Sequence, residues 1–166
     1  IHSFDNKDRW ITNIDLATGS ISTIDHQRDE AWIAGPGISS FNVGWVNEHT
    51  LYFQSERTGY SHLYLADLSS STQRSLTSGN YEVQSCMLSA DKKSFYITTN
   101  EVHPGEKHFY KLNIQDGKKT QLTNLTGANQ AVISPDEKYI AFLHSYSNKP
   151  WELYLQENKN GAKPKQ

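Results

Sequence analysis

Short apolar clusters separated by polar turns follow one another along the whole chain. Within a cluster the apolar and polar positions alternate, as in Leu63–Leu68, and Tyr, Phe, Ile and Thr are frequent. Alternation with a period of two, bounded by turn residues, predicts half-buried β-strands. Because apolar residues are not sustained at helical spacing, the pattern predicts an all-β chain.

The strands repeat. Three similar segments are Gly44–Phe53, Leu88–Ile97 and Ile133–Phe142. Each predicts a strand, a turn headed by Asn47, Asp91 or Asp136, and a second strand, because Asx side chains favour tight turns. The repeats are roughly 45 residues apart; a third strand follows each pair, and a fourth follows the first two pairs. Four short strands in about 45 residues are typical of a β-propeller blade.

We therefore expect an all-β, partial β-propeller of about three to four blades, each with four antiparallel strands. It would be cut from a larger ring, because propellers close with ~4–8 blades. The expected parts are a partial blade 1–27, blades 38–80 and 81–126, an incomplete blade 127–157, and a polar tail 158–166 that forms a solvated linker. The side chains expected to be buried are Trp45, Leu51, Phe53, Leu63, Leu88, Phe95, Ile97, Ile133, Ile140 and Phe142.

The ends of the chain suggest a piece of a longer protein. It begins at Ile1, its one methionine is Met87, and nothing at the front is typical of a signal peptide. An interrupted ring leaves unpaired strand edges, and such edges recruit other chains. We therefore expect self-association through the cut blades.

Composition removes several classes of function. The 166 residues carry a formal net charge of −2, which gives no reason to expect nucleic-acid binding. No apolar run approaches the ~18 residues that span a bilayer, so no membrane insertion is expected. A single cysteine, Cys86, forms neither an internal disulfide nor a zinc site of several thiolates.

Catalytic motifs are missing from the sequence. There is no Gly-x-Ser-x-Gly turn, no glycine-rich phosphate loop, and no pair of histidines at metal-binding spacing. We expect no catalytic residue, no metal ligand and no cofactor. Asp29 and Glu30 beside Trp32 are a candidate cavity loop for an amine ligand; the alternative is an inter-blade turn in which Trp32 covers the edge of the core.

The run Ser55–Tyr64 is the most specific signal. Its pattern, Ser-Glu-Arg-x-Gly-Tyr-x-His-Leu-Tyr, resembles the N-terminal propeller of dipeptidyl peptidase IV-type proteins, in the prolyl oligopeptidase family of serine peptidases. The stretch Asp29–Ile33 is similar to the bacterial branch. The motif residues, expected to be mainly structural, are Ser55, Glu56, Arg57, Gly59, Tyr60, His62 and Tyr64. The charge pair at Glu56 and Arg57 fits a solvated hairpin tip better than a catalytic site, with Gly59 supplying positive φ.

The resemblance implies a propeller of about eight blades that caps an α/β-hydrolase domain. Peptide enters between the two domains, and the nucleophile, acid and base lie in the hydrolase domain. The resemblance thus implies that this chain is a non-catalytic segment that gates substrate access, packs on the hydrolase domain and is inactive alone. Together with the single Cys86, it implies a bacterial parent that is periplasmic or secreted. The alternative is a binding or scaffold propeller with no peptidase attached.

Overall fold

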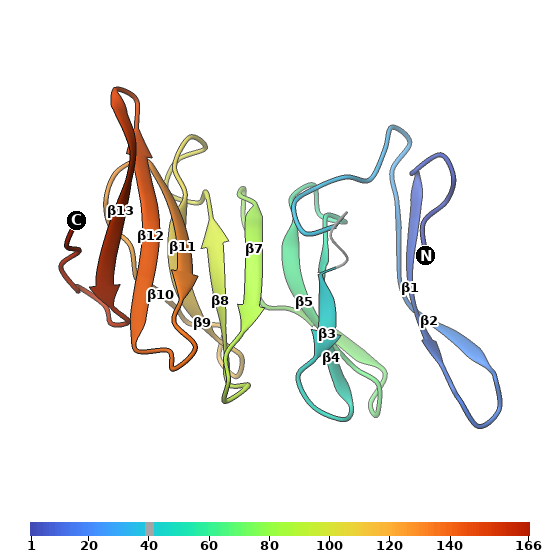
Figure 1. The fold of residues 1–166 in the computed structure, drawn as a ribbon. Coiled ribbons are helices and arrows are strands. Elements are labelled where there is room, and N and C mark those ends of the chain that lie inside the picture. The colour runs from blue at the N-terminus through green and yellow to red at the C-terminus, as the bar shows by residue number, and fades with distance from the viewer. Residues whose placement is uncertain (39–41) are drawn as a thin grey trace. The chain divides into compact units, whose positions relative to one another are not determined.

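The computed structural model describes residues 1–38 and 42–166 (Figure 1). All regular elements among these residues are β-strands, arranged in four antiparallel sheets, which confirms the predicted all-β class. The described residues contain no helix long and apolar enough to cross a membrane. The chain divides into two compact units, Ile1–Ser75 and Leu76–Gln166, and each is described by itself.

The first unit holds two sheets. The strands of the first sheet are β1 (Asp8–Ile14) and β2 (Ile21–Arg28). The strands of the second are β3 (Val43–Trp45), β4 (Thr50–Ser55), β5 (His62–Asp67) and β6 (Thr72–Ser75). Strands pair in chain order, β3-β4-β5-β6, as expected for a propeller blade.

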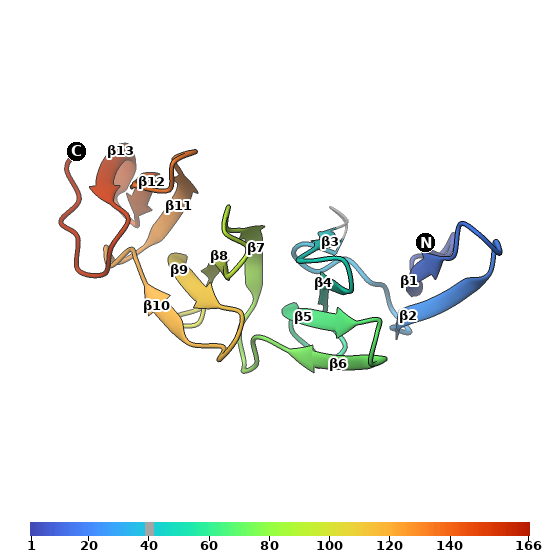
Figure 2. The ribbon, with the colours of Figure 1, turned by 90° about the horizontal axis from the view of Figure 1, so that it is seen from below.

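The second unit also holds two sheets. The strands of the first are β7 (Val83–Leu88), β8 (Ser94–Thr99), β9 (His108–Asn113) and β10 (Lys119–Gln121). The strands of the second are β11 (Ala128–Ile133), β12 (Tyr139–Tyr146) and β13 (Lys149–Glu157). Figure 2 shows the strands of each sheet following one another in the order of the chain.

Short polar side chains close the turns, as the repeat predicts. The Asn47 carboxamide oxygen accepts hydrogen bonds from the backbone N–H groups of His49 and Thr50. At the β8 turn, the Ser89 hydroxyl donates to Asp91, whose carboxylate accepts from the Lys93 N–H. The same pattern recurs at Ser134, Asp136 and Lys138 before β12. These local bonds set where each hairpin reverses, and so the register of its strands.

The cores lie between successive sheets within each unit. In the first unit, the core residues of β4 and β5 are Leu51, Phe53, Tyr64 and Ala66. Ile11 of β1 and Ile24 of β2 pack against them. In the second unit, Tyr96, Phe109, Leu122, Ile140 and Phe142 form the corresponding cluster.

A stacked pair of aromatic rings on neighbouring strands is common to three of the sheets. The ring centroids are 5.6 Å apart in Phe53–Tyr64, 5.7 Å in Tyr96–Phe109 and 5.5 Å in Phe142–Tyr154. Such cross-strand pairs add stability beyond the burial of their surface. The repeat in sequence is therefore also a repeat in packing.

Seven of the ten side chains predicted to be buried are buried, which confirms most of the predicted core. Leu88 and Ile133 are half-buried. The prediction for Trp45 is wrong, because this side chain is 51 % exposed. Trp45 lies on β3, the strand at the end of its sheet, and the buried position is the next residue, Val46.

The tail after β13 is not the free linker that its polar composition suggests. It folds back, so that Leu155 and Lys165 exchange both backbone hydrogen bonds, at 2.8 and 2.9 Å. The side chain of Ala162 is buried in this turn. The tail thus covers part of the β13 edge.

Replacing Phe142 by alanine should lower the free energy of unfolding by about 3–5 kcal/mol, because the side chain is 1 % exposed and loses its stacking partner. The matched control is Val132→Ala, at a side chain that is 66 % exposed, with an expected loss within about 0.5 kcal/mol. Urea unfolding measures both. Equal losses would contradict the assignment of this core.

The outer face of β11–β13 carries exposed apolar side chains, and self-association remains a prediction. The residues are Val132, Leu143, Trp151, Leu153 and Leu155. Because contiguous apolar patches mark interaction surfaces, we expect the mass of the chain to rise with concentration in light scattering, and Leu153→Lys to reduce the rise. A monomeric mass over a tenfold range of concentration would refute the expectation.

Candidate functional site

The Ser55–Tyr64 motif forms the hairpin between β4 and β5. Ser55 ends β4, His62 begins β5, and Gly59 at the tip has a φ of 92°. The Ser55 hydroxyl donates to the side-chain oxygen of Gln27 at 2.9 Å, and the Glu56 N–H donates to the same oxygen at 3.1 Å. The start of the hairpin is therefore fastened to β2 of the neighbouring sheet.

Arg57 makes the second connection between these sheets. Its Nη1 donates to Asp25 Oδ1 at 2.9 Å and to Gln73 Oε1 at 3.0 Å. The guanidinium also lies over the Tyr64 ring, 4.0 Å from its centroid. We call Arg57, Asp25, Gln73 and Tyr64, together with Gln27, the Arg57 network. Gln27 is included because it binds Ser55 and Glu56, next to Arg57.

Asp25 is the buried charge of the network. Its side chain lies on β2 in a residue that is 5 % exposed, and burial raises the pKa of its carboxyl group. The charges of Arg57 and Arg9 oppose this rise in the pKa. Without a cation beside it, a carboxylate this deep would be costly to keep ionised.

A second arginine supports the hairpin from below. Arg9 on β1 is buried, and its Nη1 donates to the backbone oxygen of Gln54 at 2.6 Å. Burial lowers the pKa of Arg9. The Gln54 amide in turn donates to the Ser61 hydroxyl and to the Pro36 carbonyl, at 3.1 and 3.3 Å. The loop after β2 is thereby tied to β4.

The contacts of the motif residues join one strand to another, and their structural role stays a prediction. Ser55 is fully buried and donates to an amide oxygen, so its hydroxyl is neither accessible nor paired with a base. His62 is buried opposite it, and Tyr60 is partly exposed at the tip. Within residues 1–38 and 42–166, no group of three or more His, Cys, Asp or Glu side chains is placed to hold a metal ion.

The candidate cavity-loop residues make local contacts, and their role at a cavity stays a prediction. The Asp29 carboxylate accepts the N–H groups of Ala31 and Trp32, and so serves the turn itself. Glu30 pairs with Arg28, with 3.1 Å between Nε and Oε1. In the alternative interpretation Trp32 covers the edge of the core, but in this structure its side chain is 70 % exposed and Ile33 is buried instead.

Sequence reasoning missed Asp25 and Gln27. Both are polar residues at the buried positions of β2, with exposed His26 between them. Three consecutive polar residues, Asp25-His26-Gln27, carry no alternation, so the sequence alone contains no signal of which side is buried.

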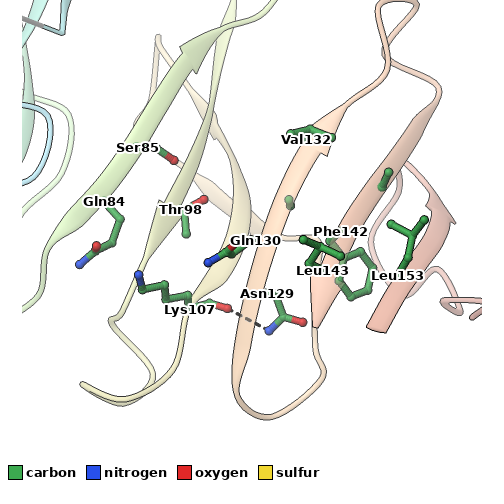
Figure 3. A pocket seen from close by; sticks show the side chains of 12 residues that line it. Gln84, Ser85, Thr98, Lys107, Asn129, Gln130, Val132, Phe142, Leu143 and Leu153 are labelled. Carbon is green, nitrogen blue, oxygen red and sulfur yellow. Dashed lines mark hydrogen bonds between the residues drawn. The ribbon is translucent and has the colours of Figure 1, made fainter. Parts of the chain in front are cut away.

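A hollow of about 450 Å³ lies in the second unit, between β7–β8 and β11–β12 (Figure 3). One wall is polar, with Gln84, Ser85, Thr98 and Lys107 from the first sheet and Gln130 from β11. The apolar lining comes from both faces of the other sheet: Ala131 and Phe142 lie on the face that packs against β8 and β9, and Val132, Leu143 and Leu153 lie on the outer face. The buried Asn129 lies at the base, where its amide donates to the Lys107 carbonyl at 2.9 Å.

Antiparallel sheets that repeat along the chain, with similar packing between them, define a β-propeller segment. Comparison with known proteins gives its family. The sequence model of the dipeptidyl peptidase IV (DPP IV) N-terminal region matches residues 5–151. The chain belongs to this family, as the Ser55–Tyr64 motif predicted.

Curated relatives agree with this assignment. Dipeptidyl peptidase 4 of Arthroderma otae is 30 % identical over 157 residues, which are 90 % of this chain and 20 % of that protein. Dipeptidyl peptidase 4 of Trichophyton rubrum is 29 % identical over 150 residues, which are 86 % of this chain and 19 % of that protein. The chain thus spans about a fifth of the length of these relatives.

Solved structures show the same fold. The dipeptidyl peptidase 4 of Porphyromonas gingivalis aligns with a TM-score of 0.72 at 20 % identity, over 92 % of this chain and 21 % of that one. TolB from Acinetobacter baumannii aligns with a TM-score of 0.57 at 22 % identity, over 98 % of this chain and 39 % of that one.

A double-mutant cycle tests the Arg57 network. We expect Arg57→Gln and Asp25→Asn to show a coupling energy of about 1 kcal/mol near pH ~7, since Arg57 is partly exposed. The pKa of Asp25 is higher in the folded than in the unfolded chain, so protonated Asp25 stabilises the folded state at low pH. This stabilisation is lost as the pH rises through the pKa that Asp25 has in the folded chain. Arg57 offsets that loss only where Asp25 is ionised, so the coupling should shrink near pH ~3. A coupling that does not change with pH would contradict this assignment.

Proposed function

We propose that this chain is a non-catalytic propeller segment of a dipeptidyl peptidase IV-like serine exopeptidase. The observation that carries the proposal is the match of the family model over residues 5–151. The curated relatives named dipeptidyl peptidase 4 are about five times longer, so they leave room for a further domain. In this proposal, the segment packs on an α/β-hydrolase domain that lies outside these 166 residues.

The role of the segment in the parent is to gate the access of peptide substrates. Two features of the chain support this role. The motif residues are used to fasten one sheet to the next, as in the bonds from Ser55 and Arg57, so they shape a wall rather than react. A hollow with both polar and apolar lining opens on the second unit, where a passing peptide has groups to contact.

We also propose that the parent belongs to the bacterial branch and is periplasmic or secreted. The similarity at Asp29–Ile33 and the single cysteine, Cys86, support the bacterial branch, and the location follows from the family resemblance. Fractionation of cells that express the parent gene tests it, and a parent found only in the cytoplasm would contradict it.

The full parent protein should release dipeptides from a chromogenic Xaa-Pro substrate, whereas the 166-residue chain alone should not. The reason is that the chain supplies no accessible nucleophile paired with a base among its described residues. Release of p-nitroaniline from glycyl-prolyl-p-nitroanilide measures both proteins under the same conditions.

The control is Ser55→Ala in both proteins, with activity expressed per folded molecule. We expect the parent to keep its kcat, because Ser55 bonds to Gln27 and not to substrate. Turnover by the chain alone that vanishes with Ser55→Ala would overturn the proposal. A folded parent that hydrolyses no Xaa-Pro substrate would instead support the alternative of a binding or scaffold propeller.

A further inference from the structure

We propose that the hollow beside β11 binds an extended peptide segment through a carboxylate group. The hollow lies wholly within the second unit, between the sheet β7–β10 and the sheet β11–β13. The proposal rests on the proposed function only in expecting that peptides reach this surface. It is carried by three properties of the lining: an unpaired ammonium, unused hydrogen-bond donors and a strand edge.

The ammonium belongs to Lys107, the residue before β9. Its backbone is fixed, because its carbonyl accepts from the Asn129 N–H at 3.0 Å and from the Asn129 amide at 2.9 Å. Its side chain is half-buried, and within the described chain it forms no ion pair. Among the described residues that line the hollow, none is acidic. A partly desolvated ammonium without a counter-charge favours an anionic ligand.

Hydrogen-bond donors surround this charge. The side chains of Gln84, Ser85, Thr98 and Gln130 line the same hollow, and in the described structure none of them bonds to another residue. Figure 3 shows that they come from both sheets, with Gln130 on β11 and the other three on β7 and β8. Amides and hydroxyls are able to donate to the two oxygens of a carboxylate. The set is therefore matched to an acceptor-rich anion rather than to a cation.

The main-chain groups at the edge of β11 indicate that the ligand is a peptide. β11 is the first strand in the order β11-β12-β13, and Asn129 directs its N–H to Lys107 and away from β12. Lys107 already pairs with this edge at Gly127–Asn129, through its bridge to Ala128. Because hydrogen-bonding direction alternates along an antiparallel strand, the N–H and C=O of Ala131 face the same edge just beyond that stretch. An extended peptide adds to such an edge by main-chain hydrogen bonds.

The apolar side of the hollow limits the ligand further. Val132 on β11, Leu143 on β12 and Leu153 on β13 are exposed and lie on one face of the sheet. They provide contact for the aliphatic part of a peptide whose carboxylate lies at Lys107. The carboxylate comes either from an acidic side chain or from the C-terminus of the peptide, and the experiment separates these two sources.

The test is an NMR titration of the ¹⁵N-labelled chain with three short probes. Acetyl-Ala-Ala-Glu-Ala-Ala-amide presents a side-chain carboxylate, acetyl-Ala-Ala-Gln-Ala-Ala with a free C-terminus presents a terminal one, and acetyl-Ala-Ala-Gln-Ala-Ala-amide presents none. We expect shifts at the amides of Ala131 and Lys107 with one or both of the first two probes, and a Kd at least about tenfold weaker for the neutral probe. Equal binding of all three probes, or binding of none, would overturn the proposal.

Variants separate the charge of Lys107 from the general charge of the chain. Lys107→Gln keeps the backbone bonds to Asn129 and should weaken binding of the acidic probe about tenfold. The matched control is Lys118→Gln, which removes the same charge from an exposed lysine that does not line the hollow, and it should leave the Kd unchanged. Equal effects of the two variants would overturn the proposal.

A second variant guards against a folding defect. Gln130 is exposed, so Gln130→Ala should leave the thermal unfolding temperature unchanged. It should weaken the binding of whichever carboxylate probe binds the unchanged chain. Unchanged affinity in this variant, with weakening only in a destabilised Lys107→Gln protein, would overturn the proposal. Because the readout is binding by the chain, it fails or succeeds independently of Xaa-Pro hydrolysis by the parent.

Discussion

Burial of one face of each sheet against the next sheet is the constraint on which both units depend. A strand pair in isolation is marginal in water, and a four-stranded sheet with two wet faces has no core. The stacked rings of Phe53 and Tyr64 in the first unit, and of Phe142 and Tyr154 in the second, lie where sheets meet. The same packing unit recurs because the same sequence unit recurs.

Polar contacts then fix which sheet faces which. The Arg57 network joins a hairpin tip on β4–β5 to β2, and Arg9 joins β1 to the backbone of β4. Apolar surfaces slide more readily than hydrogen-bonded groups with a required partner, so buried polar pairs add specificity to the register between sheets. In the most characteristic run of the sequence, Ser55–Tyr64, Ser55 and Arg57 make such contacts between strands.

The strands and turns were predictable because they depend on residues that are close in the sequence. The exposure of single side chains was not, because it depends on packing between residues far apart in the sequence. Alternation and Asx residues were enough for the hairpins at Asn47 and Asp136, because those bonds span only a few residues. The exposure of Trp32 and Trp45 depends on which sheet covers which strand, and alternation does not contain that information. The hollow could not be predicted from the sequence either, because Lys107 and Gln130 come to line one space only in the folded chain.

The role of Asp25 shows the same limit from the other side. A buried aspartate in a strand contradicts simple patterning, and here Arg57, far away in the sequence, pairs with it while Arg9 adds a second positive charge. Sequence patterning identified Arg57 as part of a motif. It did not identify the residue that Arg57 neutralises.

The most direct test of the central claim is an experimental structure of the complete parent protein. The account predicts that residues 1–166 form consecutive blades of one propeller ring, with an α/β-hydrolase domain packed against the ring and the hollow at Lys107 open to the space between them. A ring in the parent with no hydrolase domain, or a parent in which these residues do not form consecutive blades, would contradict the account.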